Sequence, residues 1–418
     1  MAAERAHLSL AHGLLLATVA VLPFGVAAEL PLLAGAIAGL IALARGRIDW
    51  ALPTTRLALV LGLAYWLPQF ASALDSLAPE KSWTEAALDL RFLPFLLFVA
   101  QPVREGQDAG RTLLTGIAAL TLAWCADALL QATTGLSLGG AATSDRLSGI
   151  FGAGNLKLGG VIAVLAPFAL IAAWHRFRAW GLLVCFLALL VVVLLAGARA
   201  AWIGLALGSG LALWHLLGGR RALLGLVAAM VLVALVSALG YVSSERFAQR
   251  LDRTAAALSA DHDGIEHALS GRLAIWDVAW RMGEDHPVNG VGVRAFRHAY
   301  PDYAAPDDVF VDAQTGQGAF HAHQIMLELW SETGAIGLAC WLLAVLFGWR
   351  GWRRQPANAR ARAMPAAIAL AVALFPVNTH YAVYSAFWGL LLIWLLGTWL
   401  ALLAGAADPS ADAAHPGR

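Results

Sequence analysis

Charged residues are scarce in this chain. Asp, Glu, Lys and Arg together make up 13% of its 418 residues, about half the share that is usual in soluble globular domains. Hydrophobic residues make up 60% of the sequence. Apolar runs of about 20 residues, the length that crosses about 30 Å of hydrocarbon, recur from end to end. The alternating segments of about 10 residues that build membrane β-barrels are absent. The sequence therefore predicts an all-α polytopic membrane protein.

Cysteines and clustered basic residues are also few. The three cysteines, Cys125, Cys185 and Cys340, all lie in apolar runs, so we interpret them as packing residues and expect no disulfide framework. The net charge is +1 and no basic tract is present, which argues against a nucleic-acid partner. The N-terminus shows no small-residue cleavage site ahead of a soluble domain, so the first apolar run is expected to be a retained anchor.

The apolar runs predict about twelve membrane spans. They lie near 9–27, 29–44, 56–74, 86–102, 112–131, 157–174, 179–197, 199–217, 222–242, 326–349, 363–380 and 383–404. The run near 86–102 contains Arg91. We therefore divide the chain into spans 1–9 within residues 1–242, a large polar loop over 243–325, spans 10–12 within 326–405, and a tail over 406–418.

The distribution of Lys and Arg sets the expected orientation, because short loops retain these residues on the cytoplasmic side. Arginines occupy both termini and every second connection. They are Arg5, Arg45, Arg47, Arg56, Arg104, Arg111, Arg176, Arg178, Arg220, Arg221, Arg350, Arg353, Arg354, Arg360, Arg362 and Arg418. Both termini and the tail are therefore expected in the cytoplasm. The 243–325 loop is expected on the opposite side, together with the loop over 132–156 and the turn near Gly197.

Two helices are expected inside the large loop. The first covers about 244–258, and the second begins near Ser270, a suitable N-cap, and runs to about Met282. Leu273, Trp276 and Trp280 fall on one face of the second helix, and Asp277 is spaced to pair with Arg281. The stretch 283–292 is predicted to be an irregular turn. A Gly290-Val291-Gly292 pattern there is not a dinucleotide site, because no strand precedes it.

Cationic and titratable residues gather at the outer ends of the predicted spans. Arg199 begins an apolar helix after a very short turn, and a cation beside hydrocarbon costs a few kcal/mol unless it is paired or wet. Arg272 lies in the first turn of the second loop helix, where a solvated surface role is the alternative. A pair of arginines would suit a phosphate ligand, because the guanidinium fork binds phosphate oxygens in a bidentate way.

The loop ends in Phe320-His321-Ala322-His323-Gln324, directly before another apolar run. Either imidazole is a candidate general base, because it titrates near neutral pH. Zinc is the alternative for His-x-His, but no cysteine and no clear third ligand lies nearby. The stretch Asp261-His262-Asp263 resembles a metal-binding triplet of some glycosyltransferases, but in an acidic, histidine-rich loop such a triplet does not establish a metal site.

Glu328 and Glu332 are four residues apart, so they share a face of the following helix. They are expected in its first outer turns, where water reaches them, with the orientation of a His or Arg side chain as the alternative. Gly334 and Gly337 are expected to allow close helix packing.

Four segments together resemble the O-antigen ligase and polymerase superfamily. They are Ala198-Arg199-Ala200-Ala201-Trp202, the pair Gly271-Arg272 with Trp276, the turn Pro287-Val288-Asn289-Gly290-Val291-Gly292 with Phe296, and His321-Ala322-His323-Gln324 with Leu327, Glu332 and Gly334. Superfamily members typically carry Ser-Arg where this chain has Ala198-Arg199, so a hydroxyl is missing here. They typically carry His-Asn where it has His323-Gln324, so a side-chain amide is retained.

The resemblance implies a fold of the GT-C-like glycosyltransferase type in the bacterial inner membrane, with the active site facing the periplasm. It implies that His323 is the catalytic base and that Arg199 and Arg272 bind a pyrophosphate. Arg146 is a weaker candidate on the same side. His321, Trp276 and Glu332 complete the predicted substrate-binding set, and no metal or cofactor is expected.

The first choice of function is transfer of an O-antigen glycan from undecaprenyl pyrophosphate to the lipid A–core oligosaccharide, by direct displacement with inversion. A polymerase or a protein O-oligosaccharyltransferase of the same superfamily would share the donor and differ in the acceptor. A lipid-linked glycan transporter is an alternative from another class. It would show related halves and interrupted helices near midplane charges, whereas here the charges gather at one face.

Overall fold

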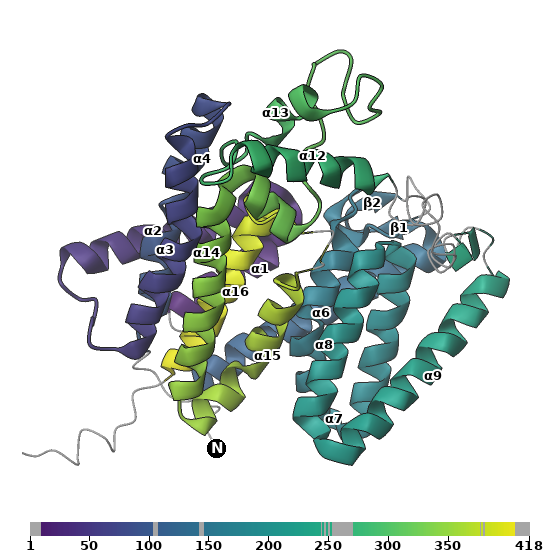
Figure 1. Cartoon of the computed structure of the whole chain (residues 1–418). Helices are drawn as coiled ribbons and strands as arrows, with labels where there is room; N and C mark the ends of the chain where they lie inside the picture. The colour runs from purple at the N-terminus through teal and green to yellow at the C-terminus, as the bar shows by residue number, and fades with distance from the viewer. Residues whose placement is uncertain are drawn as a thin grey trace, which may run out of the picture.

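The computed structural model describes residues 10–102, 108–141, 146–243, 245, 248–249, 251–252, 271–376, 378 and 381–405 (Figure 1). The Asp261-His262-Asp263 triplet, most of the predicted 244–258 helix and the 406–418 tail lie outside these residues. The elements in chain order are α1 (Leu10–Val21), η1 (Leu22–Ala28), α2 (Glu29–Ala44), α3 (Pro53–Ala73), α4 (Pro79–Asp89), α5 (Phe92–Val99), α6 (Asp108–Thr134), β1 (Leu136–Ser137), β2 (Gly140–Ala141), η2 (Gly149–Phe151), α7 (Lys157–Ala196), α8 (Arg199–Leu217), α9 (Gly219–Ser243), α12 (Arg272–Asp285), α13 (Phe296–Tyr303), α14 (Ile325–Arg354), α15 (Ala357–Ala373) and α16 (Ala386–Ala404).

Seven helical segments are long and apolar enough to cross a membrane, within the part of the chain described. They are Leu10–Ala44, Ala109–Thr134, Lys157–Ala196, Arg199–Leu217, Gly219–Ser243, Ile325–Arg354 and Ala386–Ala404. The prediction of an all-α polytopic membrane protein is therefore confirmed. The number of crossings stays a prediction.

Three of these long segments contain a backbone break, and the third, in α14, is described below. Gly25, at φ 64° and ψ −118°, lies in η1 between α1 and α2. Arg178, at φ 57° and ψ −142°, divides α7. A Cβ built on Gly159 would lie 3.0 Å from the Cβ of Ala196, so the two halves of α7 fold back on each other. This agrees with the separate spans predicted near 157–174 and 179–197.

The continuous span predicted near 86–102 is wrong. The chain breaks at Leu90 and Arg91 into α4 and α5, and α5 has only 8 residues, about 12 Å of helix. Arg91 explains the break, because its guanidinium pairs with Glu29 at 2.9 Å and with Asp89 at 3.2 Å. Helix α5 instead packs tightly on α2.

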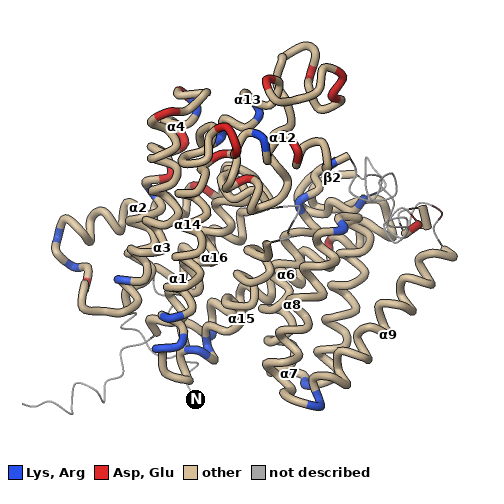
Figure 2. Tube along the Cα trace, in the orientation of Figure 1, with Lys and Arg blue, Asp and Glu red and all other residues tan. Residues whose placement is uncertain are grey.

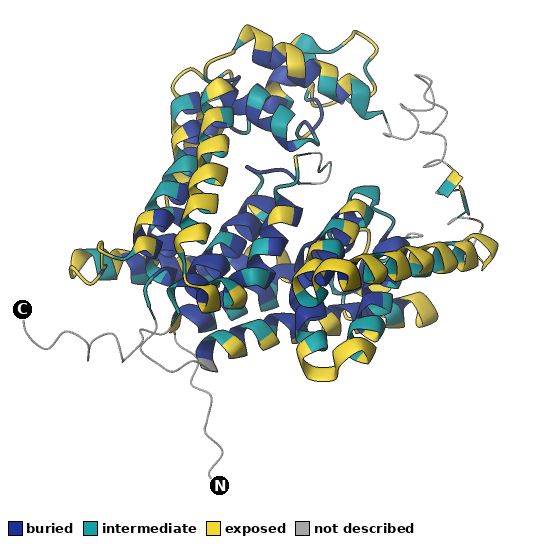
Figure 3. Ribbon diagram, turned by 60° about the horizontal axis from the view of Figure 1, so that its bottom comes forward, coloured by how far each residue is buried: buried dark blue, intermediate teal, exposed yellow. Residues whose placement is uncertain are grey.

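Helix α16 lies near the centre of the bundle (Figure 1), and its residues are mostly buried. Buried residues are concentrated in the middle of the bundle (Figure 3). In contrast, α9 lies at the side of α7 and α8 and is largely exposed in this chain (Figure 1). Helices α12 and α13 lie over one end of the bundle and have a small core of their own. It includes Ile275, Val278, Met282, Phe296 and Tyr300. Helix α13 was not expected from the sequence.

Acidic residues are concentrated at one end of the bundle, whereas Lys and Arg occur at both ends. Figure 2 shows Lys and Arg residues at the turn within α7 and near the α14–α15 connection, at the end of the molecule opposite α12. Asp and Glu residues gather mainly around α4, α12 and α13 at the other end. These two arginine-rich connections, which the sequence places on one side of a membrane, therefore lie at one end of the structure.

Helix α14 breaks at Gly334, which has φ 60° and ψ −154°. The break leaves backbone groups on both sides of it available to the turn that precedes α13. Four hydrogen bonds result, from Val291 N to Ser331 O, Gly292 N to Glu332 O, Ala335 N to Pro287 O and Ile336 N to Val288 O, of 2.8 to 3.1 Å. The first turns of α14, over residues 325–333, are thereby joined to the outer segment.

Candidate active site

The His321–Gln324 segment connects the outer segment to α14. Gln324 is the N-cap of α14: its Oε1 accepts a hydrogen bond from Leu327 N at 2.6 Å, and its Nε2 donates to Pro376 O at 2.8 Å. The amide that the sequence retains at this position therefore fixes the start of the helix to the segment after α15. Preceding it, His323 has φ 54°, a left-handed conformation that is uncommon outside glycine and is often found at functional sites.

The two imidazoles lie against each other. The ring centroids of His321 and His323 are 4.0 Å apart, and the ring planes are tilted by 50°. Both rings are half-buried, whereas Ala322 between them is fully buried in the small outer core. The buried alanine and the Gln324 cap hold the backbone on either side of His323. The imidazole is thereby held at the junction of the outer segment and the bundle.

Arg199 begins α8, as predicted. The preceding Gly197 ends α7 in a left-handed conformation, φ 71°, and the Cβ built on Gly159 meets Ala196, Ala198 and Ala201. This tight packing of small residues explains why the turn is short. The Arg199 side chain is half-buried at the end of the bundle that α12 covers.

Arg272 is the first residue of α12, after Gly271 at φ 77°. Burial, and after it the charge of Arg199, lower the pKa of Arg272 below its ordinary value. The two guanidiniums, which come from distant parts of the sequence, therefore lie within electrostatic reach of each other. Two guanidiniums in one half-buried place suit an anionic ligand, because each guanidinium fork binds carboxylate or phosphate oxygens in a bidentate way.

The segment that follows Arg146 lies beside the same turn. Leu147 N donates to Leu195 O at 3.4 Å, two residues before Gly197. Further along, Gln131 Oε1 accepts from Ser148 N at 3.0 Å and from Gly149 N at 2.9 Å. Arg146 thus belongs to the same rim as Arg199, which the sequence could not establish.

Helix α15 connects this rim to the histidines. Cβ atoms built on Gly204 and Gly208 of α8 would lie 3.2 and 3.1 Å from Val372, so the end of α15 packs against the outer half of α8. Four residues after Val372, Pro376 accepts the hydrogen bond from Gln324. The start of α8 and the start of α14 are therefore attached to the same segment.

The expectation that water reaches Glu328 and Glu332 is wrong, because each is only 1% exposed. Glu328 accepts hydrogen bonds from Val383 N at 3.0 Å and Tyr384 N at 3.2 Å. Glu332 accepts from Arg294 N at 2.6 Å. The two carboxylates hold the segment before α16 and the turn before α13, so both act on backbone. Nothing in the local sequence pattern indicates these long-range partners.

Trp276 lies on α12 one turn after Arg272, and its ring is half-buried. Its indole Nε1 is buried without a hydrogen-bond partner among the described residues. The buried face of α12 is formed by Ile275, Val278, Ala279 and Met282, and not by the face that Trp276 shares with Trp280. Trp280 is 52% exposed. The predicted ion pair between Arg281 and Asp277 is present.

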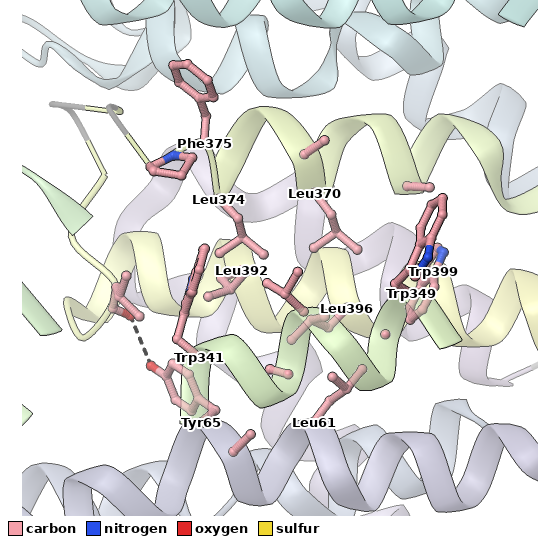
Figure 4. Close-up of a pocket in the computed structure, with 18 of the residues that line it drawn as sticks. Leu61, Tyr65, Trp341, Trp349, Leu370, Leu374, Phe375, Leu392, Leu396 and Trp399 are labelled. Carbon is pink, nitrogen blue, oxygen red and sulfur yellow. Dashed lines mark hydrogen bonds between the residues drawn. The ribbon is translucent and has the colours of Figure 1, made fainter. Parts of the chain in front are cut away.

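An apolar cavity of about 750 Å³ lies between α3, α8, α14, α15 and α16 (Figure 4). Leucine, tryptophan and other apolar side chains dominate its wall, including Leu61, Trp341, Leu370, Leu374, Leu392 and Leu396. Pro376 and Tyr384 are part of the same wall, and these are residues that Gln324 and Glu328 hold. The sequence does not predict this cavity, because it forms between helices that are far apart in the chain.

Within the described residues, no group of three or more His, Cys, Asp and Glu side chains is placed to hold a metal ion. The arrangement offers instead clustered guanidiniums, a held imidazole and a large apolar cavity. Such a site can hold an anion joined to an apolar chain and can accept a proton from a third group.

Comparison with known proteins agrees with the resemblance drawn from the four motifs. A family model described as O-antigen ligase matches residues 184–342. This segment runs from the second half of α7 to the middle of α14 and contains Arg199, Arg272 and His323. No curated protein gives a significant match. Residues 184–342 are therefore similar to the O-antigen ligase family, the same family that the four motifs resemble.

Proposed function

We propose that this protein is a glycosyltransferase that moves a glycan from undecaprenyl pyrophosphate to a hydroxyl of the lipid A–core oligosaccharide. The observation that carries the proposal is the approach of Arg199 and Arg272 at the end of a bundle that also contains a large apolar cavity. A lipid-linked pyrophosphate has the same two parts, an anionic head and an apolar chain. The O-antigen ligase match over the segment that carries both arginines supports the same substrate class.

Arg199 and Arg272 hold the pyrophosphate in this proposal, and Arg146 is placed to join them. Negative charge grows on the pyrophosphate as its bond to the sugar breaks, and arginines already in position stabilise that charge without rearrangement. Guanidiniums stay charged when half-buried and bind phosphate oxygens in pairs. The cavity beside α8 and α14 takes the isoprenoid chain, whose burial among apolar side chains contributes binding energy.

His323 acts as the base. It takes the proton from the acceptor hydroxyl as the oxygen attacks the anomeric carbon, and the pyrophosphate leaves from the opposite face with the electron pair of the broken bond. The configuration at that carbon inverts, and no covalent glycosyl-enzyme forms. The neighbouring ring of His321 and the Gln324 cap fix the direction of the imidazole.

Glu332 and Trp276 have different parts in this proposal. Glu332 is a positioning residue, because its carboxylate holds the backbone of Arg294. Trp276 is a donor contact, since its buried indole N–H lies one turn from Arg272 and can donate to a phosphate or sugar oxygen. The active site faces the periplasm, and both termini lie in the cytoplasm, as the arginine-rich connections indicate.

Reconstitution tests the proposal. Purified protein in nanodiscs is given a glycan on undecaprenyl pyrophosphate together with lipid A–core, and transfer is followed on a gel. Arg199→Ala and Arg272→Ala are each expected to lower the rate about 10²- to 10³-fold. His323→Ala is expected to lower it about 10²- to 10⁴-fold.

Arg281→Gln is the matched control, because Arg281 is an exposed arginine of α12 that pairs with Asp277. It is expected to keep the wild-type rate. A second lipid-linked glycan in place of lipid A–core identifies a polymerase if it is the better acceptor. A His323→Ala variant that transfers at the wild-type rate would contradict the assigned base.

A further inference from the structure

A second group of cations lies around α4 and α13, apart from the Arg199–Arg272 pair. The turn before α13 is hydrogen-bonded to α3 and α4: Ser82 Oγ donates to Val293 O at 2.7 Å, and Val293 N donates to Ser72 Oγ at 3.0 Å. Lys81 precedes Ser82 and Arg294 follows Val293. These bonds therefore bring Lys81 of α4 beside Arg294, although the two residues are far apart in sequence.

The backbone of Arg294 is held in a demanding conformation. Its φ is 60°, which costs a non-glycine residue on the order of 1 kcal/mol or more, and its N–H is bound by the buried carboxylate of Glu332 at 2.6 Å. The guanidinium Nε of Arg294 is buried and has no hydrogen-bond partner among the described residues. A buried donor without a partner in a folded protein calls for a ligand, a water or an ion.

Arg297 shows the same property on the first turn of α13. Its guanidinium lies 4.3 Å from the centroid of the Phe320 ring, and its Nε is buried without a hydrogen-bond partner in the described part of the chain. The bond from Gly318 N to Arg297 O, 2.8 Å, holds the two segments together. Phe320 is 65% exposed and is only three residues before His323. An exposed aromatic ring with a cation on it therefore lies three residues before the proposed base in the chain.

Three cations act on one histidine in this region, where carboxylates of α4 and α13 also lie. Burial, and then the charges of Arg297, Lys81 and Arg294, lower the pKa of the exposed His298. None of the three cations forms an ion pair with a described carboxylate. The charges of Arg294 and Lys81 also act on Glu85, whose pKa is raised by burial. The pKa of the exposed Asp312 is lowered mainly by hydrogen bonds from the backbone of Gln314 and Thr315, and to a smaller extent by the charge of Arg297.

The two cationic groups lie toward opposite ends of α12. Arg272 begins this helix, which has 14 residues and is therefore about 21 Å long. Helix α13 packs beside the later part of α12, and α4 lies on the far side of the bundle from α8 (Figure 1). A donor held at Arg199 and Arg272 therefore leaves the α4–α13 group free for the other substrate.

We propose that Lys81, Arg294, Arg297 and His298, together with the ring of Phe320, form the acceptor-binding surface, and that its ligand is an anionic glycolipid carrying phosphate on its sugars. Phosphate oxygens contact the guanidinium and ammonium groups. The apolar C–H face of a sugar ring lies on Phe320, which directs a hydroxyl toward His323. This inference rests on the proposed function and adds the chemistry by which the acceptor is chosen.

The test uses one glycolipid acceptor in two forms, with and without its sugar phosphates. A Lys81→Gln and Arg297→Gln double variant is expected to raise KM for the phosphorylated form about tenfold, which corresponds to about 1.4 kcal/mol. Its kcat, its binding of donor and its KM for the dephosphorylated form should equal those of the wild type. Arg281→Gln serves again as the matched control and should change none of these. Phe320→Ala should raise KM for both forms.

Two results would overturn the inference. One is an equal KM of double variant and wild type for the phosphorylated acceptor. The other is a KM difference that disappears in nanodiscs without anionic phospholipid, since the cations would then serve a bilayer headgroup. Acceptor binding without donor is measured in parallel. If the wild type binds the phosphorylated form in preference but transfers nothing, the proposed function fails while the acceptor surface stands.

Discussion

Replacing Gly334 by alanine is predicted to be one of the most damaging single changes in this protein. Its φ of 60° with ψ of −154° lies in a region that is nearly exclusive to glycine and costs other residues about 1–3 kcal/mol. The added Cβ would lie 2.5 Å from Val288 C and O and 2.6 Å from Asn289 N. These are backbone atoms, which cannot move aside as the end of a flexible side chain can.

Relief of that overlap separates α14 from the turn before α13. The four backbone hydrogen bonds between them contribute about 1 kcal/mol each in net terms. With the conformational cost, the expected loss is about 3–5 kcal/mol if only part of the hydrogen bonding survives. Because residues 325–333 follow His323 directly, glycan transfer is expected to fall together with stability.

Thermal unfolding of the purified protein in detergent, with transfer measured on the same samples, checks this prediction. Gly348→Ala is the matched control, since it lies on the same helix and a Cβ there meets nothing within 4 Å. It should leave Tm unchanged or raise it, because alanine favours a helix by about 1 kcal/mol over glycine. A Gly334→Ala protein with wild-type Tm and activity would refute the reasoning.

Three further changes follow from the site. Glu328→Gln should lower Tm, because an amide has only one acceptor oxygen, whereas the two carboxylate oxygens accept from Val383 N and Tyr384 N. The expected loss of stability is about 1–3 kcal/mol, and an unchanged Tm would argue against a role of Glu328 in holding this segment. Gln324→Ala should cost about 1 kcal/mol as a lost N-cap and lower kcat more than donor affinity, whereas Gln324→Asn should restore part of both. Arg272→Lys keeps the charge but loses the guanidinium fork, so transfer should fall about tenfold in rate assays, while equal rates for lysine and arginine would exclude bidentate binding.

Much of the bundle could be predicted from the sequence because hydrophobic length and arginine placement are local signals. The division of α7 at Arg178 coincides with a charged break in an apolar run. The start of α8 at Arg199 and that of α12 at Arg272 likewise follow from nearby glycines, Gly197 and Gly271. The site residues were selected by motif, and the structure adds that Arg199 and Arg272 share one electrostatic neighbourhood.

The remaining features depend on partners that are distant in sequence. The spacing of Glu328 and Glu332 is typical of a solvent-exposed helix face. This face is buried only because the helix breaks at Gly334 and because the turn before α13 and the segment before α16 pack on it. Helix α13 was missed because it is short, polar and contains Pro301. The predicted span near 86–102 failed because Arg91 finds Glu29 on another helix, which no local pattern reveals.

The fastening of the α15–α16 connection to α14 has a mechanical consequence. Gln324 is hydrogen-bonded to Pro376, and Glu328 is hydrogen-bonded to Val383 and Tyr384. One wall of the apolar cavity is therefore attached to the start of α14, which follows the His323 imidazole in the chain. An isoprenoid chain that separates the helices around the cavity would therefore strain these hydrogen bonds. We therefore expect occupation of the apolar cavity to be coupled to the orientation of the His323 imidazole. A donor with a shortened isoprenoid chain should leave this imidazole less well oriented, even when its pyrophosphate is fully bound.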